Sequence, residues 1–204
     1  MKQSKFIIFL LIFIFSLSSC GTSAQQDNSV TKENNSTETE LENKESEKLE
    51  ESSVEVENKW FFFGTDLDGN EISSKELLAE ADLTLVNIWA TYCGPCKVEL
   101  PDLALISENY ADKNVKVLGI AADIAHGYPE TIELAEEILK EAGVNYVNFT
   151  FNEEISEKVL SEIYAVPTSL LIDSNANVIG EPLIGTKSYE EFSYSIDLAL
   201  EDIK

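Results

Sequence analysis

Two cysteines that directly follow a long apolar run constrain the fold more than any other feature of this sequence. The run Leu83 to Ala90 reads LTLVNIWA, which is typical of a strand buried on both faces. The sequence CGPC begins three residues later at Cys93, and the segment from there to about Tyr110 reads as a helix with an expected kink at Pro101. A buried strand that passes at once into a helix indicates an α/β fold.

The same alternation of strand and helix patterns continues along the chain. The predicted strands lie at 60–63, around Ile72, and at 83–90, 115–121, 146–151, 169–173 and 178–179. The predicted helices lie at 73–78, 93–110, 130–142, 153–163 and 188–203. We therefore expect a sheet with parallel strands at its centre and antiparallel pairs towards its ends.

The first 19 residues predict a secretory signal peptide. Lys2 and Lys5 precede an apolar run from Phe6 to Leu17, which is shorter than the roughly 20 residues that a membrane-spanning helix needs. The run ends in LSSC at Cys20, which resembles the lipobox of bacterial lipoproteins. That resemblance implies cleavage before Cys20 and acylation of this residue, and several acyl chains give stable membrane anchoring. The alternatives are an ordinary signal peptide with a chance cysteine and an uncleaved anchor.

The next segment is polar and acidic. Between Gly21 and Asn58 there are 11 acidic residues, 3 lysines and no aromatic residue, so this segment has too little apolar surface to offset its chain entropy. We predict a lipidated cysteine and a disordered acidic tether at 20–58, and one domain at 59–204. The whole chain has a formal net charge of −24 and no arginine, which argues against nucleic-acid binding.

The spacing of Cys93 and Cys96 at a helix start suits reversible disulfide chemistry. The free N–H groups and the dipole of the helix stabilise a thiolate, so we predict Cys93 as the exposed nucleophile and Cys96 as the buried resolving thiol. Gly94 would let a partner backbone approach closely, and Pro95 suits the first helical turn. The alternatives are a static structural disulfide, a pair without function, and a zinc pair, which would need two more ligands when His126 is the only histidine.

Three motifs occur in a fixed order along the chain. They are Trp89 to Cys96 (WATYCGPC), Glu99-Leu100-Pro101, and Val166-Pro167-Thr168 before the strand at 169–173. Together they resemble the thioredoxin superfamily and, within it, the TlpA/ResA-like thiol–disulfide oxidoreductases. The resemblance covers roughly 59–204 and implies a thioredoxin-like fold: a central mixed sheet flanked by helices, with an N-terminal β-hairpin and an inserted helix. It also implies a cis Val166–Pro167 bond facing the cysteines, with the substrate backbone pairing beside it.

Two positions depart from the superfamily pattern. Thioredoxin itself has a buried aspartate six residues before the first cysteine, where this chain has Asn87, which cannot accept a proton. By the TlpA/ResA resemblance Glu99 is the substitute that moves protons, and the alternative is a solvated helix residue. A turn glycine is replaced by Ala176, with Asn175 or Asn177 able to adopt the left-handed conformation.

Several residues around the cysteines are candidates for substrate contact. We expect Tyr92 and Trp89 to form an apolar docking patch, although Trp89 could instead belong to the core. The full set of candidates for substrate binding is Trp89, Tyr92, Gly94, Pro95, Val166, Pro167 and Thr168. The segment 123–128 is expected to line one rim of the active face, and its His126 is an exposed loop residue, a proton relay or a copper ligand.

The sequence as a whole predicts a protein-disulfide reductase anchored by lipid to the extracytoplasmic face of the cell membrane. The Gly-Pro pair between the cysteines resembles reducing members of the superfamily, and a reductant there implies a membrane electron donor of the CcdA/DsbD type. Its expected partners are disulfide-containing client proteins, with the CxxCH disulfide of apocytochrome c as the first choice. No cofactor and no metal are predicted. The alternatives are a disulfide-forming oxidase, a copper-binding assembly chaperone using Cys93, Cys96 and His126, and a passive binding module.

Overall fold

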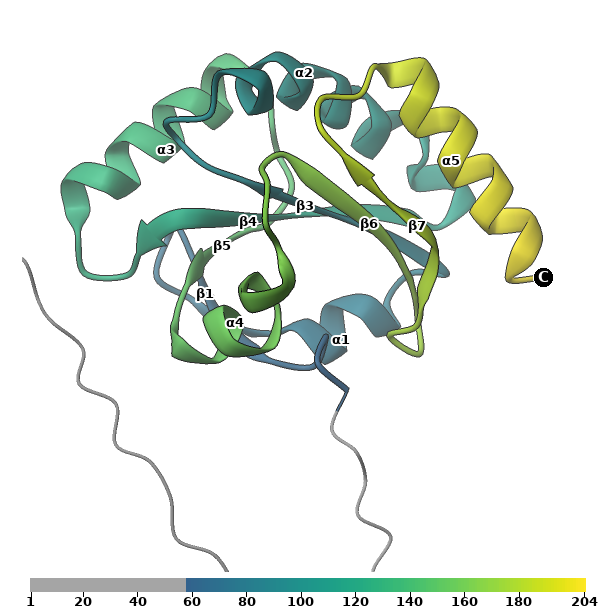
Figure 1. Cartoon of the computed structure of the whole chain (residues 1–204), viewed down its shortest axis with the longest axis horizontal. Coiled ribbons are helices and arrows are strands. Elements are labelled where there is room, and N and C mark those ends of the chain that lie inside the picture. The colour runs from purple at the N-terminus through teal and green to yellow at the C-terminus, as the bar shows by residue number, and fades with distance from the viewer. Residues whose placement is uncertain (1–57) are drawn as a thin grey trace, which may run out of the picture. The chain divides into compact units, whose positions relative to one another are not determined.

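A mixed β-sheet forms the centre of the structure, a computed structural model that describes residues 58–204. Within these residues the sheet has seven strands in the order β2-β1-β5-β4-β3-β6-β7 (Figure 1). The strands are β1 (Phe63–Asp66), β2 (Glu71–Ser73), β3 (Leu83–Trp89), β4 (Val115–Ala125), β5 (Asn148–Phe151), β6 (Thr168–Asp173) and β7 (Val178–Ile184). The pairs β3–β4 and β4–β5 are parallel, and the other neighbouring pairs are antiparallel. This is the predicted mixed sheet, with β1 and β2 as its N-terminal hairpin.

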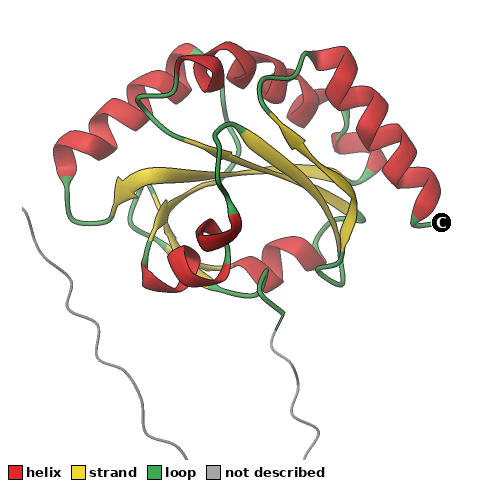
Figure 2. Ribbon diagram, in the orientation of Figure 1, coloured by secondary structure: helices red, strands yellow, loops and turns green. Residues whose placement is uncertain are grey.

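Helices cover both faces of the sheet. The helices are α1 (Ser74–Ala79), α2 (Gly94–Asn109), α3 (Pro129–Glu141), α4 (Glu153–Lys158) and α5 (Tyr189–Asp202), with short 3-10 turns at Ala111–Lys113 and Leu160–Glu162. Figure 2 shows α2, α3 and α5 on one face of the sheet and α1 and α4 on the other. The predicted architecture of a central mixed sheet between helices is therefore confirmed.

Each face of the sheet has its own hydrophobic core, and β3 contributes to both. Leu85 and Trp89 belong to the cluster that also contains Cys96 of α2, whereas Val86 and Ile88 pack into the opposite cluster beneath α1 and α4. Successive side chains of a strand point to opposite faces, so the odd-numbered residues of β3 face α2. Asn87 therefore lies on the α2 side of the sheet.

The helix that carries the cysteines begins where the sequence predicts. Cys93 is extended (φ −82°, ψ 101°) and caps α2 with its side chain, because Cys93 Sγ accepts a hydrogen bond from Cys96 N–H. Pro95 occupies the first turn, where no N–H is needed. The predicted Ser73–Glu76 cap of α1 also forms, since Ser73 Oγ accepts from Glu76 N–H.

Several predicted elements have different limits in the structure. The strand expected at 115–121 continues to Ala125, and the strand expected at 146–151 begins at Asn148. The strand expected at 60–63 begins only at Phe63, because the backbone groups of Trp60 and Phe62 bond to the Ser74 hydroxyl instead of a neighbouring strand. The helix expected at 153–163 ends at Lys158, and after the buried Val159 the chain continues as the 3-10 turn Leu160–Glu162. The last strand extends to Ile184 rather than ending at 179.

The turn before β7 also differs in detail from the expectation. Ala176 itself takes the left-handed conformation, with φ 64°, rather than Asn175 or Asn177. The backbone N–H groups of both asparagines instead donate hydrogen bonds to Asp173 Oδ1, at 2.9 Å from Asn175 and 2.7 Å from Asn177. The Ala176 carbonyl accepts from Asn58 Nδ2 at 2.9 Å, which holds the turn in place.

The predicted signal peptide, the lipidation site Cys20 and the predicted tether up to residue 57 lie outside the described residues. These predictions, and the domain limits that depend on them, stay predictions. Within residues 58–204, no helix has the length and apolar character that crossing a membrane requires.

Candidate active site

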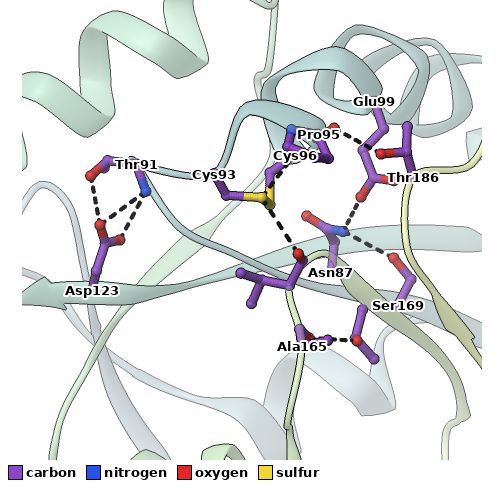
Figure 3. The surroundings of a disulfide bond; sticks show 12 residues. Asn87, Thr91, Cys93, Pro95, Cys96, Glu99, Asp123, Ala165, Ser169 and Thr186 are labelled. Atoms are coloured by element: carbon purple, nitrogen blue, oxygen red, sulfur yellow. Dashed lines mark hydrogen bonds between the residues drawn. A yellow bond between two sulfur atoms is a disulfide. The ribbon is translucent and has the colours of Figure 1, made fainter.

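The two cysteines form a disulfide at the N-terminus of α2, and Figure 3 shows its surroundings. The Cα atoms of Cys93 and Cys96 are 5.3 Å apart. Cys96 is fully buried, and Cys93, expected to be exposed, is only 6% exposed in this disulfide form. Cys93 is thus the outer of the two cysteines, but the neighbouring loops cover most of it. Its Sγ accepts from Cys96 N–H at 3.1 Å, so the helix N-terminus is in place to stabilise a thiolate there.

A buried carboxyl group lies one turn beyond the disulfide. Glu99 is only 1% exposed, which contradicts the alternative of a solvated helix residue. Its Oε1 accepts from Asn87 Nδ2 at 2.8 Å and its Oε2 accepts from Lys187 N–H at 2.9 Å. Burial raises the pKa of Glu99 to about 7, against the lowering effect of the hydrogen bonds from Lys187 and Asn87. A carboxyl group with such a pKa can take up or release a proton near neutral pH.

A second carboxyl group lies on the other side of the disulfide. Asp123 of β4 accepts three hydrogen bonds from Thr91: two from the backbone N–H, at 3.0 Å to each carboxylate oxygen, and one from Oγ1 at 2.6 Å. The contact fixes the loop between β3 and Cys93 (Figure 3). The sequence predicts Asp123 only as the first residue of the segment 123–128 that lines a rim of the active face, without a role of its own. Its position near the carboxyl end of a central strand is where α/β sheets place functional groups.

The predicted Val166–Pro167 loop lies against the disulfide. The bond between Val166 and Pro167 is cis, as the resemblance implies. The Val166 carbonyl oxygen is 3.6 Å from Cys93 Sγ. Val166 is partly exposed, whereas Pro167 is buried. The loop therefore offers a partly open backbone edge immediately beside Cys93.

The loop after β7, for which the sequence predicts no role, contacts several of these parts of the site. Gly185 N–H donates to the Pro167 carbonyl at 2.9 Å, and Thr186 Oγ1 donates to the Pro95 carbonyl at 3.2 Å. With the bond from Lys187 N–H to Glu99, the loop after β7 contacts the cis-proline loop, the CGPC turn and the buried carboxyl group. No local sequence signal indicates these contacts, since each joins segments far apart in the chain.

Two predicted substrate-contact residues have buried side chains, and for Trp89 this excludes the expected docking patch and favours the alternative of a core residue. Trp89 is fully buried, and its indole Nε1 donates to Asn148 Oδ1 at 2.9 Å, so it belongs to the core. The Asn148 amide fits there only because Gly119 has no side chain: a Cβ on Gly119 would lie 1.7 Å from Asn148 Oδ1. Thr168 is also buried, and its Oγ1 donates to the Ala165 carbonyl at 2.8 Å.

Of the remaining candidates, Pro167 is buried and Val166 is partly exposed, whereas the three residues around Cys93 are exposed. Tyr92 is 76% exposed directly before Cys93, and Gly94 and Pro95 are exposed at the CGPC turn. His126 is exposed in the loop after β4. Among the described residues no group of three or more histidine, cysteine or acidic side chains is arranged to hold a metal ion. The geometry therefore lends no support to a copper site formed by Cys93, Cys96 and His126.

Known proteins match the chain in both sequence and fold. The Redoxin family model matches residues 44–183, more than half of the chain. The thiol-disulfide oxidoreductase ResA of Bacillus anthracis is 28% identical over 132 residues, which cover 64% of this chain and 69% of that protein. The thioredoxin-like protein YneN of Bacillus subtilis is 29% identical over 135 residues, covering 65% and 72%.

Solved structures extend the comparison. A thiol:disulfide interchange protein of the thioredoxin family from Chlorobium tepidum TLS has a TM-score of 0.58 and 26% identity, covering 69% of this chain and 93% of that chain. StoA from Bacillus subtilis has a TM-score of 0.51 and 18% identity, covering 66% and 95%, and supports the fold alone. Together with the disulfide, the cis-proline loop and the buried glutamate, these findings confirm the predicted enzyme class. The chain belongs to the Redoxin family and is a thiol–disulfide oxidoreductase of the TlpA/ResA-like group in the thioredoxin superfamily.

Proposed function

We propose that this protein reduces disulfide bonds in client proteins on the extracytoplasmic side of the cell membrane, anchored there by acyl chains on Cys20. The observation that best supports the chemistry is the position of the Cys93–Cys96 disulfide. It lies at a helix N-terminus, against the Val166 carbonyl, with the Glu99 carboxyl group buried one turn away. A dithiol that reduces a client needs a nucleophilic thiolate, a second thiol that resolves the mixed disulfide, and a group that exchanges the proton, and this arrangement contains all three.

The reaction starts from the reduced enzyme. The Cys93 thiolate attacks one sulfur of a client disulfide, and the other client sulfur leaves as a thiolate that takes up a proton. The product is a mixed disulfide between Cys93 and the client. Cys96 then loses its proton and attacks Cys93 Sγ, which releases the second client thiol and leaves the disulfide present in this structure. Two electrons and two protons pass from the two cysteines to the client.

Glu99 is the group placed to move the Cys96 proton. Its side chain is buried on the same helix, one turn past Cys96, and its pKa of about 7 suits proton exchange at neutral pH. The ionised form accepts the proton as Cys96 attacks, and the neutral form can return it when the disulfide is reduced again. Asn87 cannot take this role, because an amide does not accept a proton at such pH values.

The client is expected to bind in an extended conformation over Cys93. The partly exposed Val166 backbone offers an edge for pairing, and the exposed Tyr92 ring offers an apolar contact next to the nucleophile. Gly94 and Pro95 present a small surface that would not obstruct the client backbone. Apocytochrome c, with its CxxCH disulfide, is the client that we propose first, by resemblance to the family.

The location rests on the sequence before residue 58. The apolar run, the LSSC sequence at Cys20 and the acidic segment after it support a lipid anchor followed by a tether. A flexible chain of this length spans about 35 Å, by roughly 5–6 Å times the square root of the residue number. The domain would then reach both its clients and a membrane electron donor of the CcdA/DsbD type.

The direct test measures insulin reduction and the reduction potential of the Cys93–Cys96 couple. We expect Cys93→Ser to abolish insulin reduction and Cys96→Ser to accumulate mixed disulfides. A reductase should have a potential near or below about −220 mV, whereas a value above about −150 mV would identify an oxidase. Full activity of Cys93→Ser would contradict the mechanism.

The anchor is tested separately, because it could fail while the chemistry holds. The full chain and its Cys20→Ala variant are expressed in a bacterial host, and their membrane and soluble fractions are compared. We expect the unmodified chain in the membrane fraction with an acylated N-terminus, as detected by mass spectrometry, and the variant without acylation. An unmodified Cys20 in the mature protein would overturn this part of the proposal.

A further inference from the structure

One buried polar atom beside the disulfide has no hydrogen-bond partner in the described part of the chain. Asn87 is completely shielded from solvent, yet its side-chain oxygen Oδ1 receives no hydrogen bond there. The other end of the same amide is fully used, since Nδ2 donates to Glu99 Oε1 at 2.8 Å and to Ser169 Oγ at 2.9 Å. A buried acceptor without a donor is destabilising, so it calls for an explanation.

The hydrogen bonds fix which way the amide faces. When Glu99 is ionised its carboxylate has no hydrogen to donate, and the amide nitrogen of Asn87 faces it, as the hydrogen bond from Nδ2 to Oε1 shows. The oxygen then faces away from both Glu99 and Ser169. Figure 3 shows it turned towards the disulfide.

The fold explains why the oxygen faces the cysteines. Asn87 lies on β3 between Leu85 and Trp89, and these two residues pack in the same buried cluster as Cys96. Cys96 and Glu99 are one turn apart on α2, and both are buried above this part of the strand. Asn87 contacts Glu99 directly, so its amide lies beneath the first turns of α2, on the face of the sheet where Cys96 is buried.

We propose that Asn87 Oδ1 accepts a hydrogen bond from the Cys96 thiol in the reduced enzyme. Reduction breaks the S–S bond and adds two electrons and two protons, and one proton belongs to Cys96 Sγ. This S–H group is shielded from water and needs an acceptor, whereas the disulfide form has no hydrogen to offer. Asn87 Oδ1, which accepts no hydrogen bond in the oxidised protein, is therefore the acceptor that the Cys96 S–H group requires in the reduced protein.

Asn87 is then a positioning residue that serves two groups at once. Its oxygen holds the Cys96 thiol, and its nitrogen holds the Glu99 carboxyl group that we propose receives the thiol proton. The bond exists only in the reduced form and favours that form by about fivefold in the exchange equilibrium, the usual worth of one hydrogen bond. The inference needs only that the disulfide can be reduced, so it stands apart from the client, the location and the direction of electron flow.

Infrared spectroscopy of the thiol tests this bond directly. In the full chain with Cys20→Ser and Cys93→Ser, Cys96 is the only cysteine, so its S–H stretching band reports on this group alone. We expect a band lowered in frequency by hydrogen bonding, which Asn87→Leu shifts to the frequency of an unbonded thiol. Ser169→Ala removes the other partner of the amide but leaves Oδ1 in place, so it should leave the band unchanged.

A second measurement follows the same substitution through the thiol–disulfide equilibrium. The Cys20→Ser chain, with both active-site cysteines, is equilibrated with glutathione. We expect Asn87→Leu to shift the exchange constant about fivefold towards the disulfide, and Ser169→Ala to shift it less than about twofold. A Cys96 band at the unbonded frequency in the protein that retains Asn87 would overturn the assignment without any substitution at this residue. A band that responds to Ser169→Ala alone would overturn it equally.

Discussion

Two carboxyl groups flank the redox disulfide, and the protein holds them in different ways. Asp123, partly exposed on β4, accepts all three of its hydrogen bonds from a single residue, Thr91. Glu99, buried on α2, accepts one bond from Asn87 on β3 and one from Lys187 in the loop after β7. The first carboxyl group fixes a short loop, whereas the second joins three separate parts of the fold.

The difference in burial separates their roles. The partly exposed Asp123 side chain accepts three hydrogen bonds from two donors of Thr91 and anchors the residues before Cys93. Shielding from water destabilises the charged form of a carboxyl group, so burial raises the pKa of Glu99 to about 7. We infer that Asp123 provides geometry and Glu99 provides proton transfer.

Of the two carboxyl groups, Glu99 should have the larger effect on catalysis when it is replaced. Glu99→Gln keeps the shape of the side chain but removes the group that takes the Cys96 proton. We expect the rate of client reduction to fall about 10²- to 10⁴-fold, the range typical of lost general acid–base catalysis. The measurement is the single-turnover release of client thiol from the mixed disulfide at pH 7.

Asp123→Asn is the matched control, because it neutralises the other carboxyl group next to the same disulfide. It should lower the rate far less than Glu99→Gln does, since Asp123 contacts Thr91 rather than the buried cysteine. Equal losses of rate in the two variants would show that the two carboxyl groups do not differ in role.

The sequence predicts the part of this site that depends on local patterns. The cap at Cys93, the proline in the first turn and the cis bond before Pro167 all follow from short motifs, and the structure contains them. The order of strands and helices is also local, because it depends on apolar runs and on turn residues.

The contacts that distinguish the two carboxyl groups do not follow from local patterns. Thr91 and Asp123 are 32 residues apart, and Glu99 and Lys187 are 88 apart, so only the folded sheet brings them together. The same limit explains the error at Trp89, whose place next to the motif suggested a docking surface although β3 is buried on both faces.

The pH dependence of stability gives a second test of Glu99. The pKa of Glu99 is raised to about 7 in the folded protein from an ordinary 4.5, so between these pH values the folded chain holds a proton that the unfolded chain has lost. The free energy of unfolding therefore falls as pH rises through this window, by up to about 3 kcal/mol from this group.

Glu99→Gln cannot lose this proton, so its stability relative to the unmodified protein should rise between pH 4.5 and pH 8. Urea unfolding of the oxidised proteins across this range gives the difference at each pH. Subtracting the two curves cancels the effect of the other acidic residues. A difference that does not change with pH would contradict the raised pKa of Glu99.

Thr91→Val tests the anchor on the other side of the disulfide. It removes the 2.6 Å hydrogen bond from Thr91 Oγ1 to Asp123 but leaves the backbone bonds in place. We expect a loss of about 1–2 kcal/mol in the free energy of unfolding, typical of one hydrogen bond to a charged group at a partly open site. In contrast with Glu99→Gln, this loss should be nearly constant between pH 6 and 8, as urea unfolding would show.

The smallest expected effects come from charges near Glu99, and they should have opposite signs. The positive charge of Lys187 lowers the pKa of Glu99, and the negative charge of Asp102 raises it, both less than burial does. Lys187→Met should therefore move the pH midpoint of client reduction upwards, and Asp102→Asn should move it downwards. The Lys187 backbone N–H that bonds to Glu99 is kept in Lys187→Met. The variant also loses the hydrogen bonds that Lys187 Nζ donates to the Ile184 and Gly185 carbonyls at 2.6 and 3.1 Å, so it changes loop contacts as well as charge. A shift of the midpoint in the same direction in both variants would show that loosening of the site, rather than charge, sets the midpoint. Glu99 would then resemble Asp123 as a purely structural carboxylate.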